Sequence, residues 1–567
     1  MHNDYSGPEN LIFVGAGATA ALGFPCTSQQ ETTLHGAAEL PHNADCKRSY
    51  YIQVANILLC SSNKLQWLVE ALADLLELVD YEDELKGYEN LPCERHFKLL
   101  EKNAPAGWTE KDSRKTFFHL RENYSWNVLR TAVLGCPYSV EFSSECSFHL
   151  NDLYNLFDFH LRTGHGIQLE KQAVSPKETE KARNLLLLIQ YIQMYGAWHN
   201  AIKNQRGMLS QYYNFAKTLG TEMLAEGFRL VNEDSTLELN ARKFYLMSYG
   251  IVSMNYDPIF LMMIMCAHND LNKQPPYIGA PPQTLKLFND FSYFMATPRL
   301  HQQNTPAIAQ RSTWFPLNEP VAQRLNDPEH ISRRVRIGKF LMTHGMIGMR
   351  DCPNCGKVTN YLGEEWSFNS PDMMLPPPLN AFKSPDSQKQ SVKENNEFLR
   401  LDQLHCVHCG ALLGIDNLLM APQSSFKSNL SPVLEEIGRD MRVLLMACKH
   451  VILLGYSLPK DDAEFRAILS ARLSSFHEKK RDKEAPRCSV IVGTTGEKRW
   501  IYGAELKTAL QNSQISDGSA RETILQAISI FGLKQVRYYG AGIPAVFYDD
   551  TGTASPEAIK KMLKWDG

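Results

Sequence analysis

The chain has 567 residues, 44% of them hydrophobic, and a formal net charge of −3 at pH 7. This length exceeds what one hydrophobic core usually holds and indicates about three or four structural units. The charge offers no basic surplus of the kind that binds a phosphate backbone, so we expect no direct nucleic-acid binding.

The ends and the cysteines of the chain bear on its compartment. The opening residues, MHNDYSGPEN, lack the charged and apolar regions of a secretory signal, and no stretch reaches the ~18 uninterrupted apolar residues of a membrane span. The 13 cysteines are an odd number without such a signal, which favours reduced thiols over a disulfide framework. We therefore expect a cytoplasmic protein without membrane contact.

The first predicted element is a buried strand, Leu11 to Val14, which ends in the glycine turn Gly15, Ala16, Gly17, Ala18 and Thr19. Glycines after a strand let the backbone turn tightly and approach a diphosphate, whose charge the start of a following helix favours. The third glycine of a dinucleotide fingerprint is not at its usual place. An ordinary strand-to-helix turn with small residues for packing is therefore the alternative.

A long helical region follows this turn. In LQWLVEALADLLELVD, apolar residues recur at three- and four-residue steps, which places them on one face of a helix. Two later segments, LNDLYNLFDFHLRTG and ETEKARNLLLLIQYIQMYGAWHNAIK, show similar signals. We predict a mainly helical insertion over residues 51–245, preceded by the first part of an α/β domain over residues 1–50.

Strand-like runs return after residue 245, in YGIVSMNYD, KFLMTHG, HVILLGYS and CSVIVGTTG. Continuous apolar strands separated by helices indicate a parallel sheet that is covered on both faces. In such sheets, the residues just after the carboxyl ends of the strands line the ligand crevice. These residues are the candidates for a functional site.

Three of the predicted strands are followed by polar or small residues. Asn255 and Asp257 can bind ribose hydroxyls or a water molecule, although both residue types are also typical of turns before a proline. His344 can act as a general base near neutral pH, although a structural histidine is the commoner fate. Gly455 permits close approach of a ligand, and the Ser457 hydroxyl can bind a phosphate or a ribose.

Two Cys-x-x-Cys pairs, each followed by glycine, give the strongest local signal. Paired thiolates at this spacing can bind one tetrahedral zinc ion, and four such ligands leave no open position for catalysis. The four cysteines are Cys352, Cys355, Cys406 and Cys409. A proline- and serine-rich insert, residues 370–396, predicted to be disordered, accounts for the long spacing between the pairs. His405 and His408 are less favoured as ligands.

In this order, the glycine turn, Asn-x-Asp, His-Gly, the two cysteine pairs and Gly-Tyr-Ser resemble the sirtuin-like NAD-consuming fold. GAGATAALGFP is similar to the family's Gly-Ala-Gly-x-Ser-x-x-x-Gly-Ile-Pro loop, with Gly23 and Pro25 matching its end. NYD, HG and GYSL are similar to the family's other signatures. The resemblance covers the first 25 or so residues and most of residues 245–500.

The resemblance implies a fold class: an α/β protein with a Rossmann-like parallel sheet that binds NAD, a large helical insertion and a small zinc-ribbon module. The Rossmann-like domain would continue over residues 246–345 and 421–567, and the zinc ribbon would occupy residues 346–420. The zinc ion would be structural, and NAD+ would be the substrate.

The resemblance also implies roles for individual residues. The turn from Gly15 to Thr19 would contact the diphosphate and the nicotinamide ribose. Asn255 would position a ribose hydroxyl or water, Asp257 would support the ribose side, and His344 would be the base. The adenosine half would lie against the loop Gly455, Tyr456 and Ser457.

Departures from the family pattern favour one reaction. Protein deacylases continue Gly-Ile-Pro with Asp-Phe-Arg, whose phenylalanine shields the sugar cation from water, whereas this chain has Cys26, Thr27 and Ser28. Met254 replaces the glutamine that usually precedes the asparagine. We therefore expect hydrolysis of NAD+ to nicotinamide and ADP-ribose. The alternatives are an NAD-dependent protein deacylase and a non-catalytic NAD or ADP-ribose-binding assembly module.

The resemblance extends to bacterial NAD-depleting effectors of antiphage defence. It implies a homo-oligomer that works with a partner ATPase or another defence protein. The helical insertion would then mediate assembly or hold the site closed until a trigger binds. The alternative is that the insertion merely enlarges the fold.

Overall fold

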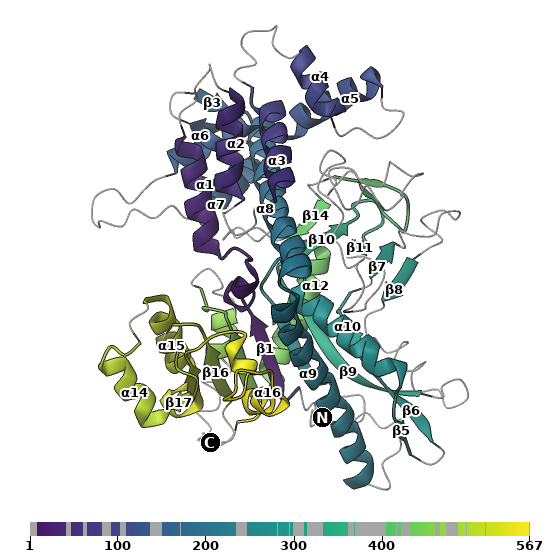
Figure 1. Ribbon diagram of the computed structural model, residues 1–567, viewed down its shortest axis with the longest axis vertical. Helices are drawn as coiled ribbons and strands as arrows, with labels where there is room; N and C mark the ends of the chain where they lie inside the picture. The colour runs from purple at the N-terminus through teal and green to yellow at the C-terminus, as the bar shows by residue number, and fades with distance from the viewer. Residues whose placement is uncertain are drawn as a thin grey trace.

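A nine-stranded sheet and a set of long helices form a mixed α/β fold (Figure 1). The computed structural model describes residues 8–40, 47–59, 65–81, 92–102, 109–136, 150–169, 172–233, 247–279, 282–293, 295–298, 311–314, 333–360, 368, 404–414, 417–420, 431–459, 465–471, 486–494, 496–515 and 518–565. The predicted insert over residues 370–396 lies outside these described residues.

The strand order of the large sheet is β17-β18-β16-β15-β1-β4-β9-β6-β5. Neighbouring strands are parallel except at the two edges, where β17 and β5 are antiparallel to their neighbours. The strands are β1 (Asn10–Val14), β4 (Met247–Ser253), β5 (Tyr277–Ile278), β6 (Gln283–Asp290), β9 (Arg333–Met342), β15 (His450–Leu454), β16 (Arg487–Ile491), β17 (Trp500–Tyr502) and β18 (Val536–Tyr539). The five strands predicted from the sequence are the five central neighbours, β16 to β9, which confirms the expected parallel sheet.

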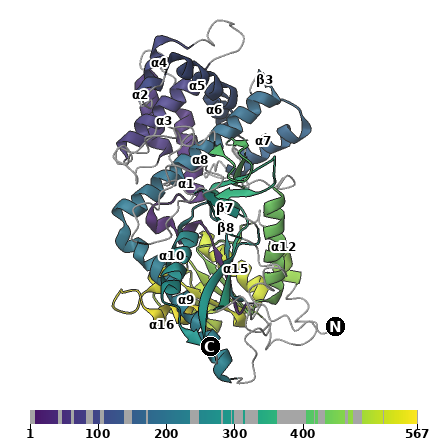
Figure 2. The same ribbon diagram turned by 90° about the vertical axis from the view of Figure 1, so that its right-hand side faces the viewer.

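Helices cover both faces of this sheet, which explains why its central strands are continuously apolar. On β9, Arg336 pairs with Glu226 of α9 (Arg206–Glu233), and Lys339 pairs with Asp440 of α12 (Pro432–Ala447). Residues three apart on a strand point to opposite faces. The helices α9 and α12 therefore lie on opposite sides of the sheet, as Figure 2 shows.

Most of the other helices lie in a body at one end of the molecule (Figure 1). They are α1 (Thr27–Glu39), α2 (Lys47–Leu58), α3 (Gln66–Val79), α4 (Glu94–Glu101), α5 (Glu110–Asn123), α6 (Trp126–Gly135) and α7 (Leu150–Thr163), with the hairpin of β2 (Ile167–Leu169) and β3 (Gln172–Val174). The helix α8 (Pro176–Asn204) runs from this body toward the sheet, and α9 continues alongside the sheet. The helices begin at Thr27, upstream of the predicted start at residue 51.

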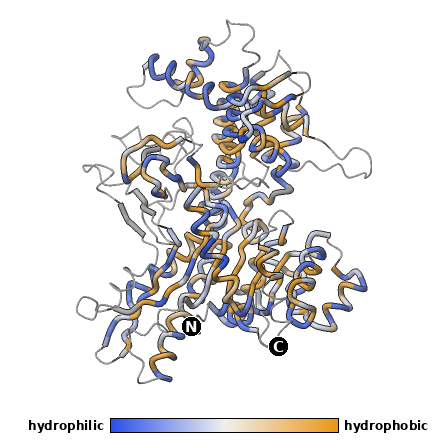
Figure 3. Tube along the Cα trace, turned by 180° about the vertical axis from the view of Figure 1, so that it is seen from behind, coloured by the Kyte–Doolittle hydropathy of each residue, from blue (hydrophilic) through white to orange (hydrophobic). Residues whose placement is uncertain are grey.

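One hydrophobic core extends from the strands of the sheet into this helical body. The predicted helix around Leu185 lies inside it, because α8 buries most of its length. Figure 3 shows hydrophobic residues in both the sheet region and the helical body, whereas α4 and α5 are mostly hydrophilic. Within the described residues, no helix has both the length and the apolar character that crossing a membrane requires.

A second sheet, which the sequence did not reveal, lies between the helical body and the large sheet. Its order is β14-β10-β11-β7-β8, with β14 (Leu418–Met420), β10 (Gly345–Asp351), β11 (Val358–Asn360), β7 (Met295–Pro298) and β8 (Arg311–Trp314). A separate hairpin joins β12 (Leu404–His405) to β13 (Leu412–Leu413). The described residues near the large sheet also form α10 (Ile259–Lys273), α14 (Gly503–Gln511), α15 (Gly518–Phe531) and α16 (Pro556–Leu563).

The loops that follow β1 and β15 pack backbone against backbone. The Gly15 N–H donates to the Leu454 carbonyl (3.0 Å), and the Gly17 N–H donates to the Gly455 carbonyl (3.1 Å). Gly455 has a φ of +60°, and a Cβ at this position would lie 2.2 Å from the backbone nitrogen of Ala18. The close contact between the two loops is enough to explain why glycine is needed at these positions. This agrees with the alternative interpretation of the sequence, in which the small residues serve packing.

This contact makes Gly455→Ala a test of the loop packing. We expect the substitution to destabilise the protein by on the order of 2–4 kcal/mol, because it combines a left-handed backbone with a steric clash. Thermal and urea unfolding followed by circular dichroism measure the change.

Gly438→Ala in α12 is the matched control, because a Cβ there meets nothing within 4 Å. It is expected to stabilise the helix by about 0.5–1 kcal/mol. Equal unfolding midpoints for the two variants would contradict the proposed loop contact.

Candidate functional site

The loop that follows β4 is tied to the ends of both neighbouring strands. The Met254 N–H donates to the Val14 carbonyl at the end of β1 (2.9 Å). From the other side, the Thr343 hydroxyl after β9 donates to the Ser253 carbonyl (3.2 Å). Together with the contact between the loops after β1 and β15, these bonds join the ends of the four adjacent strands β15, β1, β4 and β9 into one rim. The polar residues predicted from the sequence lie along this rim.

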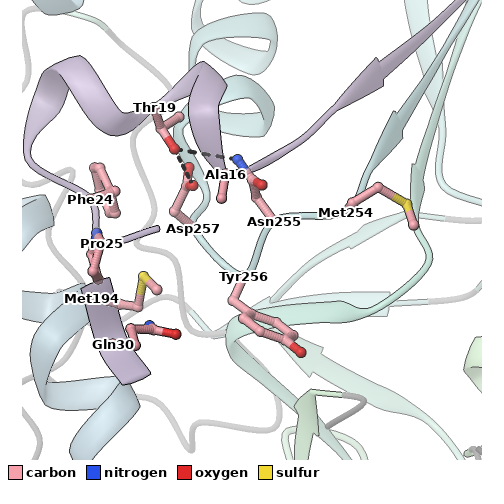
Figure 4. Close-up of a pocket in the computed structure, with 10 residues that line it drawn as sticks. All are labelled: Ala16, Thr19, Phe24, Pro25, Gln30, Met194, Met254, Asn255, Tyr256 and Asp257. Carbon is pink, nitrogen blue, oxygen red and sulfur yellow. Dashed lines mark hydrogen bonds between the residues drawn. The ribbon is translucent and has the colours of Figure 1, made fainter. Parts of the chain in front are cut away.

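A pocket opens in this rim between the loops that follow β1 and β4 (Figure 4). About 350 Å³ of empty space lies in the pocket together with the open solvent at its mouth. The lining residues are Ala16, Thr19, Phe24, Pro25, Gln30, Met194, Met254, Asn255, Tyr256 and Asp257. Apolar walls surround a small number of polar groups, as in most ligand sites.

Three of the polar groups form a buried hydrogen-bonded cluster. The Thr19 hydroxyl donates to Oδ2 of Asp257 (2.8 Å), and Nδ2 of Asn255 donates to the Thr19 hydroxyl oxygen (3.3 Å). The other carboxyl oxygen of Asp257 accepts the Ile259 N–H at the start of α10 (3.1 Å). Asp257 therefore shapes the turn into α10 and also faces the pocket. Its turn-forming role and its ligand-binding role are thus compatible.

The side-chain oxygen of Asn255 is a buried acceptor in the pocket wall. Asn255 is 6% exposed, and its Oδ1 finds no hydrogen-bond partner in the part of the chain that the structure describes. An unsatisfied buried polar atom costs about 1–3 kcal/mol. This atom is accordingly able to accept a hydrogen bond from a bound water or a ligand hydroxyl.

Burial raises the pKa of Asp257 to about 6. Removal from water disfavours the charged carboxylate. Hydrogen bonds from Thr19, the Ile259 N–H and Asn255 oppose this effect but do not cancel it. Asp257 is therefore mainly ionised at pH 7 and mainly protonated at pH 5.

His344 lies beside the same loop but outside the pocket wall. Its Nδ1 is 3.3 Å from the Met254 carbonyl oxygen, which is a hydrogen bond when Nδ1 carries the proton. Its ring centre is 6.3 Å from that of Tyr256, which does line the pocket. The structure thus places His344 next to the residues that flank Asn255, but His344 does not itself line the pocket.

The other residues predicted after β1 have different surroundings. Ala16, Thr19 and Pro25 line the pocket. The Ala18 carbonyl accepts a hydrogen bond from the buried Tyr212 hydroxyl of α9 (2.7 Å). Gly23, with a φ of +82°, ends a short 3-10 helix. The hydrogen bond from Tyr212 therefore anchors this loop to α9, and the same loop forms one side of the pocket.

The residues predicted after β15 do not line this pocket. Tyr456 is buried and stacks on Phe13 of β1 (ring centres 5.7 Å apart). Ser457 is exposed, and its carbonyl accepts from Thr523 of α15 (3.1 Å). These residues lie at the neighbouring part of the same rim, because Gly455 contacts the glycine turn.

Sequence motifs did not reveal the opposite wall of the pocket. Gln30 comes from α1 and Met194 from α8, both in the helical body. Figure 4 shows these two side chains across the pocket from Tyr256 and Asp257. Neither residue belongs to a recognisable motif, since only the packing of the helices brings them here.

The four predicted cysteines form a compact cluster. All four sulfur atoms lie within 4.8 Å of one another, with 3.5 Å between Cys352 and Cys409 and 3.7 Å between Cys355 and Cys406. Zn–S bonds of about 2.3 Å in a tetrahedron require S···S separations of about 3.8 Å. The cluster can therefore bind a metal ion such as zinc.

Two similar turns build this cluster. The Gly356 N–H donates to the Cys352 carbonyl (2.7 Å), and the Gly410 N–H donates to the Cys406 carbonyl (2.8 Å). Both glycines have a positive φ, which the tight turns require. Nε2 of His408 lies 3.2 Å from the Val358 carbonyl, which favours the cysteines as the ligands. The His405 side chain lies outside the described structure.

Comparison with known proteins adds no relative. No protein-family model matches the chain, and no curated protein matches it. The chemistry of the pocket and of the cysteine cluster therefore carries the functional conclusions.

We expect the protein, purified without chelators under reducing conditions, to contain about one zinc ion per chain, measured by elemental analysis. Cys355→Ser and Cys409→Ser should each lose most of it. Within the described residues, the buried core around the cluster is small and consists of Cys352, Cys406 and Leu413, so metal loss should also expose the two cysteine turns to proteolysis.

Cys93→Ser is the control for the metal measurement, because Cys93 is exposed and lies outside the cluster. Its zinc content should equal that of the wild type. A metal-free wild type, or cluster variants with full zinc content, would contradict this assignment.

The raised pKa of Asp257 predicts how stability depends on pH. Between about pH 4 and 6, the unfolded chain loses this proton before the folded chain does, so the wild type loses stability as pH rises. Asp257→Asn removes this effect. The free energy of unfolding of the variant, measured relative to that of the wild type, should therefore rise by on the order of 2–3 kcal/mol as the pH increases from 4 to 7.5.

Urea unfolding at pH 4.5, 6 and 7.5 measures the difference. Asp152→Asn, at an exposed position of α7, is the control and should show no such gain. A difference in the free energy of unfolding between Asp257→Asn and the wild type that stays constant across this pH range would contradict the prediction.

Proposed function

We propose that this chain is an NAD+ hydrolase that cleaves the bond between nicotinamide and ribose, releasing nicotinamide and ADP-ribose. In this proposal the large sheet is a Rossmann-like sheet, and the pocket holds the nicotinamide end of the substrate. The supporting observation is the buried cluster of Thr19, Asn255 and Asp257 at the carboxyl ends of two parallel strands, where such sheets bind ligands.

The reaction suits the groups in the pocket. When the bond between C1′ of the ribose and the pyridine nitrogen breaks, its electron pair leaves with nicotinamide, and positive charge develops on the sugar. The Asp257 carboxylate carries a negative charge, and the Asn255 side-chain oxygen is the negative end of an amide dipole. Both groups are buried and held in place, so they can stabilise this positive charge. Water then adds to C1′ and gives up a proton.

Asn255 and His344 divide the handling of that water in our proposal. Oδ1 of Asn255, which has no partner among the described residues, accepts a hydrogen bond from the water or from a ribose hydroxyl. His344 lies beside the loop and not in the pocket wall, so it receives the proton through a water or a substrate hydroxyl. Deprotonation of Asp257 above pH 6 adds the negative charge that the cation needs.

The start of α1 supports hydrolysis over transfer to a protein. Directly after Pro25, the chain enters α1 with Cys26 as its N-cap residue, and no aromatic residue stands at positions 26–28. A sugar cation in this pocket would lack the phenylalanine shield of the deacylases and would meet water. We therefore favour hydrolysis over the deacylase alternative.

We further infer a cellular role as an NAD-depleting effector of antiphage defence. An unregulated NAD+ hydrolase would harm its own cell, so the site needs control. The helical body supplies Gln30 and Met194 to the pocket wall, which supports a regulatory part for these helices. We propose cytoplasmic homo-oligomers that act with a partner ATPase or another defence protein.

A nicotinamide-release assay tests the proposed reaction. The wild type should release nicotinamide from NAD+ without any added peptide. Asn255→Ala should lower kcat/KM by roughly 10²–10³-fold, as expected for removal of a fixed polar group that stabilises developing charge. Asn56→Ala, at an exposed position of α2, is the control and should keep full activity.

Other outcomes would favour the alternatives. Release that strictly requires an acyl-lysine peptide would replace the hydrolase with a deacylase. Tight NAD+ binding by a wild type that releases no nicotinamide, with unchanged binding in His344→Ala, would indicate a non-catalytic binding module.

A further inference from the structure

The geometry points to Gln30 as the residue that selects the carboxamide group of the substrate's pyridine ring. This inference rests on the proposed function and adds a specificity determinant from the helical body. Gln30 is only 5% exposed, yet its side chain lines the pocket. A long polar side chain in such a position normally has a partner.

No hydrogen bond joins the Gln30 side-chain amide to another residue in the described ranges, although its backbone N–H is bonded to the Cys26 carbonyl. Figure 4 shows the amide end of Gln30 directed away from α1, toward the side of the pocket that carries Tyr256. The side chain is thus held in the pocket by its helix and is available to a ligand.

The chemistry of an amide determines what Gln30 can select. A primary amide offers one carbonyl acceptor and an NH2 donor group. A carboxamide on a planar ring offers the same two groups in the same geometry, so it can pair with Gln30 through two hydrogen bonds. A carboxylate on the same ring offers only acceptors and can form only one of them.

The remaining walls agree with this ligand class. Met194, Phe24 and Pro25 line the same side of the pocket as Gln30 and provide apolar surface that suits a flat ring. Asp257 faces the same space and is mainly ionised at pH 7, so it repels a second carboxylate. The pocket should therefore prefer nicotinamide to nicotinic acid, and NAD+ to its carboxylate analogue.

Gln30→Leu separates this role from packing. Leucine removes both hydrogen-bonding groups while keeping a branched apolar side chain of comparable volume, and it leaves no described partner unsatisfied. Gln66→Leu, at an exposed position of α3, is the matched control. Thermal unfolding should show that both variants remain folded.

Calorimetric binding of nicotinamide and of nicotinic acid at pH 7.5 is the main measurement, because it does not require turnover. We expect the wild type to bind nicotinamide more tightly. Gln30→Leu should weaken nicotinamide binding about tenfold, as for loss of one or two net hydrogen bonds. Binding of nicotinic acid should change less than about threefold, and Gln66→Leu should match the wild type.

A second variant, Gln30→Lys, should shift the preference toward nicotinic acid, because it places a cation where the amide stood. The kcat/KM ratio for NAD+ over its carboxylate analogue should fall in both Gln30 variants. Equal losses for the two ligands, or no loss, would overturn the role of Gln30.

The two proposals fail in distinguishable ways. If the wild type hydrolyses NAD+ and its amide preference survives in Gln30→Leu, only the role of Gln30 is wrong. If the wild type shows the preference without turnover, only the hydrolase proposal is wrong. If the wild type binds neither nicotinamide nor nicotinic acid, the role of Gln30 is wrong, and if it also releases no nicotinamide from NAD+, both are wrong.

Discussion

The position of β1 between β15 and β4 is the constraint on which the rest of the structure depends. Its end is held by backbone hydrogen bonds from one side to the loop after β15 and from the other to the loop after β4. Polar residues from distant parts of the chain then meet because their strands are parallel neighbours. The spacing of Thr19, Asn255 and Asp257 is a property of the sheet and not of any local segment.

The sequence predicted the features that local patterns encode. Continuous apolar runs identified the five central strands, and Cys-x-x-Cys spacing identified the four clustered cysteines. The polar pair in Asn-x-Asp was placed correctly at a strand end. By contrast, α1 and α2 carry weak periodicity. The strands β11 and β14 have only three residues each, and the pairing of β10 with β14 and of β11 with β7 joins segments far apart in the chain. Gln30 and Met194 reach the pocket only through helix packing, which no local pattern reports.

Burial of ionisable groups has different consequences in different parts of the fold. Lys339 is buried between Asp290 and Asp440, so each charge has a partner. Asp257 is buried with only neutral hydrogen-bond donors and retains a desolvation penalty. A fold that keeps such a carboxylate gives up stability at neutral pH for a fixed negative charge in its pocket. This arrangement is typical of sites in which function and stability compete.

The helix α8 links the far end of the molecule to the pocket. Its 29 residues make a rod about 44 Å long, and Met194 sits on it within the pocket wall. Because the helical body and the sheet share one apolar interior, cutting the chain between them would bare that interior and remove a wall of the pocket at the same time. A minimal fragment with the sheet alone would therefore lack a complete binding cavity, and anything that tilts the rod from its outer end would reshape the cavity.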